Sequence, residues 1–247
     1  MGKRPLVRRR GRGGMQFRAA VTGKLKPAKY PSFDLDEDRQ GEIIDLVHET
    51  GRDAPLSKVR FEDGSISFIP AILGTRVGSK INFGLESEIK DGNVISIQNI
   101  PDGTTVCNVE KQFGDGGTLI KSAGADATVF SHTDDGVVLK LASGKFTKLN
   151  PKNRAMIGTL AGGGVRDRPL MRAGVAWRRF KSKGHKYPIV RGVAQAAYVH
   201  PHGGGRHQHV GQSSTVSRNA PPGAKVGSIA ARKTGRARIK ERKQSIK

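Results

Sequence analysis

The residues best suited to chemistry are four histidines in the stretch HPHGGGRHQH, His200 to His209. Imidazole side chains bind metal ions, transfer protons near neutral pH and hydrogen-bond to phosphates or bases. Three roles are therefore open: a zinc site built from the two His-x-His pairs, a catalytic loop, or a loop that contacts an anionic partner.

The surrounding sequence favours the anionic partner. Between Asp167 and Glu241 lie 73 residues without a carboxylate, and the chain's one cysteine, Cys107, is far away in the sequence. A catalytic or metal-bound histidine is commonly oriented by a carboxylate, and three consecutive glycines let the backbone pass close to another surface. We expect no catalytic residue, no metal and no cofactor, and interpret the loop as an RNA contact.

Charge is segregated along the chain, which has a formal net charge of +23. Residues 1–30 carry +10, residues 31–150 carry −7 and residues 151–247 carry +20. Basic segments without acidic neighbours repel themselves unless a polyanion is present, so nucleic acid is the expected partner. The acidic middle is expected to keep that part of the chain from binding RNA indiscriminately.

Two further stretches fit an RNA partner. WRRFKSKGHK, Trp177 to Lys186, interleaves aromatic and basic residues, which suits base stacking and phosphate contact; alternatively Trp177 and Phe180 are buried on one face of a helix. ARKTGRARIKERK near the C-terminus is too poor in apolar residues for an amphipathic helix and suits contact with phosphates. The residues expected to bind RNA are Arg8, Arg9, Arg10, Arg12, Arg178, Arg179, Lys181, Lys183, Lys186, Arg191, His200, His202, Arg206, Arg218, Lys225, Arg232, Lys233, Arg236 and Arg238.

Other site types are disfavoured. GDGGTLIKS resembles a phosphate-binding loop, but Ile120 stands where such a loop has a glycine before the lysine, so we interpret it as a glycine-rich connection. Cys107 lies in the alternating run TVCNVEK and is expected to be buried. No apolar run is long enough to span a membrane, and the N-terminus lacks a secretory pattern, which favours an intracellular protein.

The middle of the chain has the pattern of antiparallel β-strands. Short apolar or alternating runs recur about every ten residues from residue 40, separated by Asp-Gly turns. In VRFEDGSISFI we expect Val59 and Phe61 to share a buried face with Ile66 and Phe68. A second set of strands follows the glycine cluster at residues 114–117, a short helix is expected near residues 170–180, and the ends are expected to be extended.

Four segments carry a family resemblance: IPDGTTVCNVE, GDGGTLIKSAG, RGVAQAAYVHPHGGGRHQHVG and SRNAPPGAKVGSIAARKTGR. They resemble successive landmarks of the universal L-two family of large-subunit ribosomal proteins, in its archaeal and eukaryotic form. The resemblance implies a mainly β fold, with an OB-like barrel followed by an SH3-like barrel and extended basic N- and C-terminal tails. The boundaries expected from it are a basic extension over 1–36, the OB-like barrel over 37–112, the SH3-like barrel and short helix over 113–194, and a Gly/His-rich basic extension over 195–247.

The same resemblance implies a function. It predicts a cytoplasmic, non-enzymatic constituent of the large ribosomal subunit that binds rRNA and supports assembly, subunit association and the peptidyl-transferase region. Its expected partners are large-subunit rRNA, neighbouring ribosomal proteins and the small subunit, with no membrane and no self-oligomer. A histidine-dependent metal-binding protein and a general nucleic-acid chaperone remain the alternatives.

The sequence departs from the family pattern beside the histidines. Gln195 and Ala196 stand where the family has Met-Asn, and Val199 stands where it has an aspartate before His-Pro. An aspartate could raise the basicity of His200, so its replacement weakens a catalytic role and leaves RNA contact intact.

Overall fold

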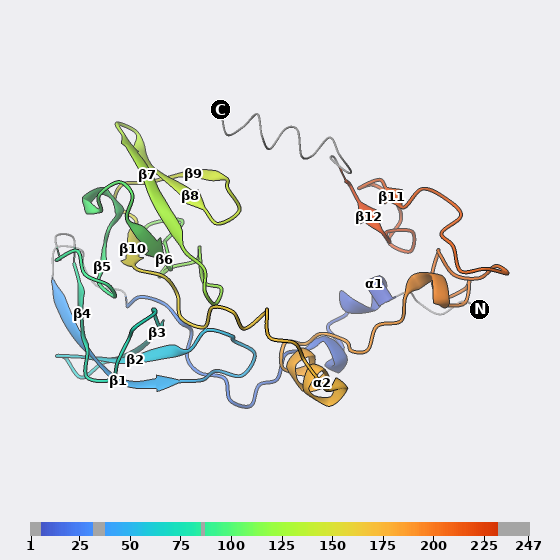
Figure 1. Cartoon of the computed structure of the whole chain (residues 1–247), viewed down its shortest axis with the longest axis horizontal. Helices are drawn as coiled ribbons and strands as arrows, with labels where there is room; N and C mark the ends of the chain where they lie inside the picture. The colour runs from blue at the N-terminus through green and yellow to red at the C-terminus, as the bar shows by residue number, and fades with distance from the viewer. Residues whose placement is uncertain (1–5, 32–37, 85–86, 232–247) are drawn as a thin grey trace. The chain divides into compact units, whose positions relative to one another are not determined.

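A computed structural model describes residues 6–31, 38–84 and 87–231, and the chain divides into two compact units. We call residues 20–171 the β unit and residues 1–19 with 172–247 the basic unit. The described elements run from α1 to β12 and are labelled in Figure 1.

The strands of the β unit form one hydrogen-bonded sheet in the order β3-β2-β1-β4-β5-β10-β6-β7-β8-β9. Their bounds are β1 Arg39–Val47, β2 Leu56–Phe61, β3 Ile66–Pro70, β4 Lys80–Phe83, β5 Val94–Ser96, β6 Thr105–Cys107, β7 Ala127–Thr133, β8 Gly136–Leu141, β9 Phe146–Leu149 and β10 Arg154–Ile157, with a 3-10 turn η2 at Ile97–Asn99. The prediction of a mainly β chain is confirmed, and the arrangement is consistent with an OB-like barrel followed by an SH3-like barrel.

Three short strands in the middle of this sheet serve two hydrophobic cores. In β10, Met156 packs into the core formed with β1 to β4, whereas Ala155 and Ile157 pack into the core formed with β7 to β9. β5 and β6 alternate in the same way, because neighbouring side chains on a strand point to opposite faces. Every residue of β5 and β10 is therefore buried. In Figure 1, β5, β6 and β10 lie between strands β1 to β4 and strands β7 to β9.

The alternation of side chains along β6 also accounts for the burial of Cys107. Val106 packs into one core and Cys107 into the other, and both side chains are inaccessible to solvent. Burial raises the pKa of the Cys107 thiol to about 12. The prediction of a buried cysteine is confirmed.

The expectation that Ile66 and Phe68 share the buried face of the β2–β3 hairpin is wrong. Val59 lies opposite Ser67 and Arg60 opposite Ile66, so Ile66 and Phe68 face away from the core and Ile69 is buried in their place. The loop has three residues rather than two, because the Phe61 amide donates to the Ser65 carbonyl and Gly64 adopts a positive φ of 78°. A shift of one residue in register turns every side chain of a strand to the other face.

A buried ion pair joins the middle of the sheet to the loop after β6. The fully buried Glu110 carboxylate accepts hydrogen bonds from Arg154 Nη2 at 2.7 Å and Nε at 3.2 Å. It also accepts from the backbone amides of Arg154 and Gly116, both at 3.0 Å. Arg154 Nη1 donates to the Pro31 carbonyl at 3.2 Å. The ion pair thus fixes the glycine-rich loop at Gly116 and the segment that ends at Pro31.

Residues 20–31 belong to the β unit rather than to a free arm. Ala28 and Tyr30 are buried, and the amides of Lys29 and Tyr30 donate to the carbonyls of Phe68 and Gly116 at 3.1 and 2.9 Å. Lys121 donates to the carbonyls of Ala28 and Gly117, and its burial lowers the pKa of the ammonium group to about 8. Lys121, the lysine of GDGGTLIKS, therefore holds residues 20–31 against the glycine-rich loop.

The basic unit contains little regular structure. Its described elements are α1 Leu6–Arg10, η1 Met15–Phe17, α2 Ala173–Ser182, η3 Gly192–Ala194, and a parallel pair of β11 Thr215–Val216 and β12 Ser228–Ile229. The helix expected near residues 170–180 is confirmed as α2, whereas α1 was not predicted from the N-terminal arginines.

Candidate nucleic-acid interface

The basic unit has almost no hydrophobic core. Among its described residues, only Ala176, Gly184 and Val226 are buried. Large apolar side chains remain exposed, including Trp177, Ile189 and Tyr198. A segment that buries so little apolar surface gains little from packing on itself and depends on a partner for further ordering.

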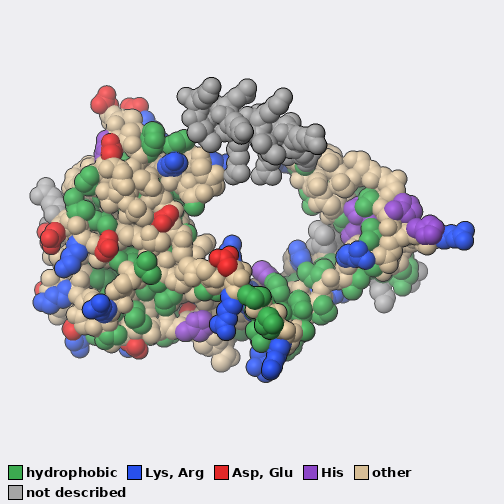
Figure 2. All heavy atoms as spheres, viewed as in Figure 1, with side chains coloured by type: hydrophobic (Ala, Val, Ile, Leu, Met, Phe, Trp, Pro, Cys, Tyr) green, Lys and Arg blue, Asp and Glu red, His purple; other side chains and the backbone are tan. Residues whose placement is uncertain are grey.

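Every charged side chain in the described part of this unit is basic. Residues 6–19 and 172–231 contain fifteen Lys and Arg and no Asp or Glu. Figure 2 shows the acidic side chains of the visible face over the β unit, and histidines beside basic side chains in the basic unit. The arrangement is suited to a polyanion, because the described part of the unit holds no acidic side chain that could neutralise its charge.

The structure brings most of the expected RNA-binding residues into this one unit. Arg8, Arg9, Arg10 and Arg12 lie in or after α1, and Arg178, Arg179, Lys181 and Lys183 lie in or directly after α2. Lys186, Arg191, His200, His202, Arg206, Arg218 and Lys225 follow in irregular chain. Arg232, Lys233, Arg236 and Arg238 lie outside the described residues. Arg18 and Arg172 also belong to the unit and were not singled out, although they share the lack of acidic neighbours that identified the others.

A glycine at the end of α2 packs closely against a segment near the N-terminus. The His185 amide donates to the Phe180 carbonyl at 2.8 Å and the Gly184 amide to the Lys181 carbonyl at 3.1 Å, which is a Schellman cap. Gly184 has a φ of 69°, and a Cβ there would lie 2.7 Å from the Phe17 carbonyl oxygen. Residues 15–19 therefore lie directly against the end of α2, which no sequence pattern indicated.

The aromatic residues around α2 are only partly buried. Trp177 is 47% exposed, so the alternative in which it is buried on a helix face is wrong for this residue. Lys181 Nζ lies 4.6 Å from the centre of the Trp177 ring, and Phe180 stacks on Tyr187 with ring centres 5.2 Å apart. The Trp177 ring remains accessible for stacking against a partner.

His200 is held against the backbone by a glycine and a hydrogen bond. A Cβ at Gly192 would lie 2.3 Å from His200 Cε1, so the ring lies directly on this glycine. The His202 amide donates to His200 Nδ1 at 3.1 Å. Nδ1 must therefore be unprotonated, which places the proton of the neutral ring on Nε2. His200 is thus a hydrogen-bond donor at Nε2 and has no free basic nitrogen for proton abstraction.

The glycines after His202 serve a contact within the chain. A Cβ at Gly203 would lie 2.3 Å from the Gln195 carbonyl oxygen, and one at Gly204 would lie 2.9 Å from Ala197 Cβ. The Gly204 amide donates to that same Gln195 carbonyl at 3.0 Å. The close approach expected from the glycines is present, but at these two positions the surface approached is residues 195–197 of the same loop.

The second histidine pair is arranged differently. His209 Nδ1 lies 2.8 Å from the His207 carbonyl oxygen, and the neighbouring Gln208 accepts from Arg191 at 3.0 Å. Within residues 6–31, 38–84 and 87–231, no three His, Cys, Asp or Glu side chains are grouped as a metal site requires. The described geometry thus gives no support to the metal-binding alternative.

We expect His200 to stay neutral down to a lower pH than an ordinary histidine. Burial, followed by the charge of His202, lowers its pKa. The unfolded chain binds the proton at about pH 6.5, so between the two pKa values it takes up more protons than the folded chain. The contribution of this group to the free energy of unfolding is therefore lost as pH falls below about 6.5.

An NMR titration of the imidazole nitrogens measures both the His200 tautomer and its pKa. The expected result is an Nε2-protonated ring with a depressed pKa, and in a His202→Gln variant the pKa should rise towards the ordinary value. A ring protonated at Nδ1, or a pKa at or above that of free histidine, would show that this hydrogen bond is absent.

Replacing Gly203 should disturb the histidine loop. We expect Gly203→Ala to force residues 195–196 and 203 apart, since its new Cβ meets backbone rather than a flexible side chain. Gly223→Ala is a matched control, because Gly223 has no atom within 4 Å of the new Cβ and neither glycine has a positive φ. Amide hydrogen exchange at positions 203 and 204 should accelerate at least about tenfold in the first variant only. Equal exchange in both variants would contradict the close packing.

Comparison with known proteins identifies the family. Residues 90–242 match the model described as Ribosomal Proteins L2, C-terminal domain. A protein of Cenarchaeum symbiosum named large ribosomal subunit protein uL2 is 79% identical over 98% of this chain and all of its own length. Proteins of the same name from Nitrosopumilus maritimus and Sulfurisphaera tokodaii are 77% and 46% identical, over 98% and 96% of this chain and over 100% and 98% of their own lengths. In the described part of the chain, no helix has the length and apolar character needed to cross a membrane. Match, identity and coverage together show that the chain belongs to the ribosomal protein L2 family, whose curated members here are named large ribosomal subunit protein uL2.

Proposed function

We propose that this protein is a structural, non-catalytic constituent of the large ribosomal subunit that binds rRNA through its basic unit. The observation that carries the proposal is the separation of charge and fold: one unit has two packed cores, and the other has fifteen basic side chains, no acidic ones and almost no core in its described part. The β unit supplies a stable platform, and the basic unit reaches phosphates that a globular surface cannot approach.

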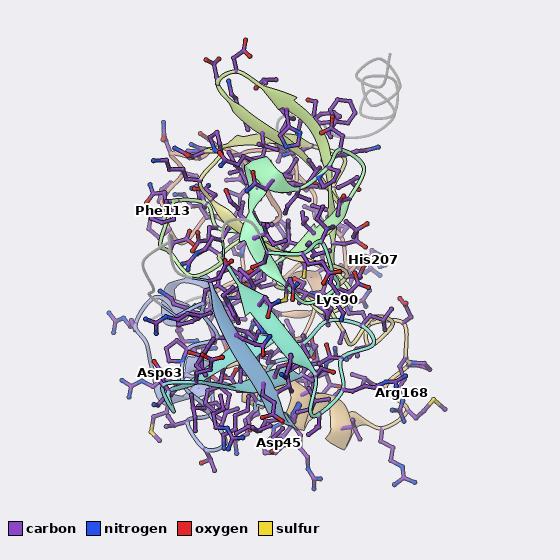
Figure 3. All side chains as sticks on the ribbon, turned by 90° about the vertical axis from the view of Figure 1, so that its left-hand side faces the viewer. Asp45, Asp63, Lys90, Phe113, Arg168 and His207 are labelled. Atoms are coloured by element: carbon purple, nitrogen blue, oxygen red, sulfur yellow. The ribbon has the colours of Figure 1, made fainter. Side chains whose placement is uncertain are left out.

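The exposed side chains suit phosphate and base contact. Arg178, Arg206 and Arg218 are exposed, and Trp177 offers an aromatic face for stacking. The acidic side chains Asp45 and Asp63, labelled in Figure 3, are exposed on the β unit and disfavour RNA there. This distribution directs RNA to the basic unit.

The histidine loop fits a contact with folded RNA. Its neutral His200 presents an N–H donor, which can bind a phosphate, a ribose hydroxyl or a base edge. From the family resemblance, we extend the proposal to support of the peptidyl-transferase region, subunit assembly and association with the small subunit. In these roles the loop acts by positioning RNA, because the proton of the neutral His200 lies on Nε2.

Sedimentation of tagged protein in cell lysate, with sequencing of the bound RNA, tests the proposal. The expected result is co-migration with large subunits and recovery of their rRNA. A protein that stays off ribosomes and binds RNA and duplex DNA equally would be a general nucleic-acid binder, and the proposal would fail.

A further inference from the structure

An exposed pair of phenylalanines lies on the outer side of the β7–β9 sheet. Phe130 is 56% exposed and Phe146 is 50% exposed, and their ring centres are 4.9 Å apart in an edge-to-face arrangement. Val129, next to Phe130, and Leu149, three residues after Phe146, are in the core, so the strands have already supplied the apolar residues that the fold needs. An edge-to-face pair leaves ring faces uncovered, which suits a flat partner.

A β-bulge places the first of these rings. Val129 pairs with Leu139 and Ser131 with Val138, so Phe130 is an additional residue with no partner in the ladder. Bulges of this kind turn a side chain away from the regular alternation. Phe146 begins β9 and lies directly across from Lys140 on β8.

The charge around the pair differs from that of the surrounding sequence. Residues 31–150 carry −7, yet no residue of β7, β8 or β9 is acidic. Lys140 and Lys148 lie on these strands, and Lys145 directly precedes Phe146. Asp134 and Asp135 lie in the β7–β8 turn, where Lys148 binds Asp135 at 2.9 Å, and Asp102 lies beside β7, 2.7 Å from His132 Nδ1.

We propose that Phe130 and Phe146 form a platform on which an unpaired RNA base stacks, with Lys140 and Lys145 directed to its flanking phosphates. The inference rests on the proposed function, since it takes RNA as the partner, and it adds a contact on the β unit outside the basic unit. A base is favoured over an apolar protein segment because lysines border the rings and every base has a π face.

The test measures binding of the full-length protein to transcribed large-subunit rRNA over a range of salt concentrations. Replacing both phenylalanines by alanine should weaken binding by about 5- to 100-fold and leave the salt dependence unchanged, because stacking releases no counterions. The double leucine variant keeps apolar area without a π face and should lose most of the same affinity. Lys140→Ala should instead reduce the slope of log affinity against log salt by about one.

Ile66→Ala is the matched control for loss of an exposed apolar side chain, since Ile66 is 40% exposed on β3 and should not affect binding. Thermal unfolding of each variant checks that the exposed substitutions leave the fold intact. Wild-type affinity in the alanine variant, or full affinity in the leucine variant, would overturn the platform alone. Failure of the wild-type protein to bind rRNA would overturn the proposed function and this inference together.

Discussion

Replacing Arg178, Arg206 and Arg218 together by alanine is expected to weaken rRNA binding on the order of 100-fold near physiological salt. Each side chain is exposed in a unit without described carboxylates. If each neutralises one phosphate, the slope of log affinity against log salt should fall by about 2 to 3, because fewer counterions are released. Filter binding of transcribed rRNA over a salt series measures both quantities.

A charge-matched variant of the β unit provides the control. Arg76, Lys90 and Lys152 are exposed there, and Lys90 is labelled in Figure 3. Their joint replacement by alanine removes the same net charge and should change the slope by less than about one. Equal losses in the two triple variants would mean that affinity follows total charge, and the assignment of RNA to the basic unit would be wrong.

Glu110→Ala is expected to destabilise the β unit by about 3–5 kcal/mol, because it leaves the buried guanidinium of Arg154 without its counterion. The substitution also removes the acceptor for the Gly116 amide, so the loop that holds Tyr30 should loosen. Urea denaturation followed by circular dichroism measures the change in the free energy of unfolding.

The exposed pair of Glu42 and Arg60 provides the comparison for Glu110. Its atoms are 3.2 Å apart and both side chains are about half exposed, at 48% and 55%. Glu42→Ala should cost at most about 1 kcal/mol, because solvent screens such pairs. A loss for Glu110→Ala as small as that for Glu42→Ala would show that the buried pair does not hold the sheet and the loop together.

Much of the β unit could be predicted from sequence because its signals are local. Alternating apolar residues and Asp-Gly turns identify the strands. The sharing of β5, β6 and β10 between two cores could not be predicted in this way, because it depends on the pairing of residues 154–157 with strands some 50 to 60 residues earlier. The register of β3 was missed because Asp63-Gly64 fits both a two-residue and a three-residue loop.

The candidate site could be predicted in composition but not in geometry. The absence of acids after Asp167 identifies the basic residues, since it needs no knowledge of the fold. Two glycines are required by contacts between separate stretches of backbone: Gly184 packs against residues 15–19, and Gly203 packs against residues 195–196. A glycine in the sequence does not show which other segment it contacts. Likewise, the tautomer of His200 depends on one backbone amide, that of His202.

The most direct test of the central claim is a map of protein–RNA crosslinks in purified large subunits, read by mass spectrometry. Nucleotide adducts should concentrate in residues 6–19 and 172–231, with Phe130 and Phe146 the exception on the β unit. Adducts spread over the β unit, or an absence of adducts from α2 and the histidine loop, would contradict the division of the chain into a folded platform and an RNA-binding unit.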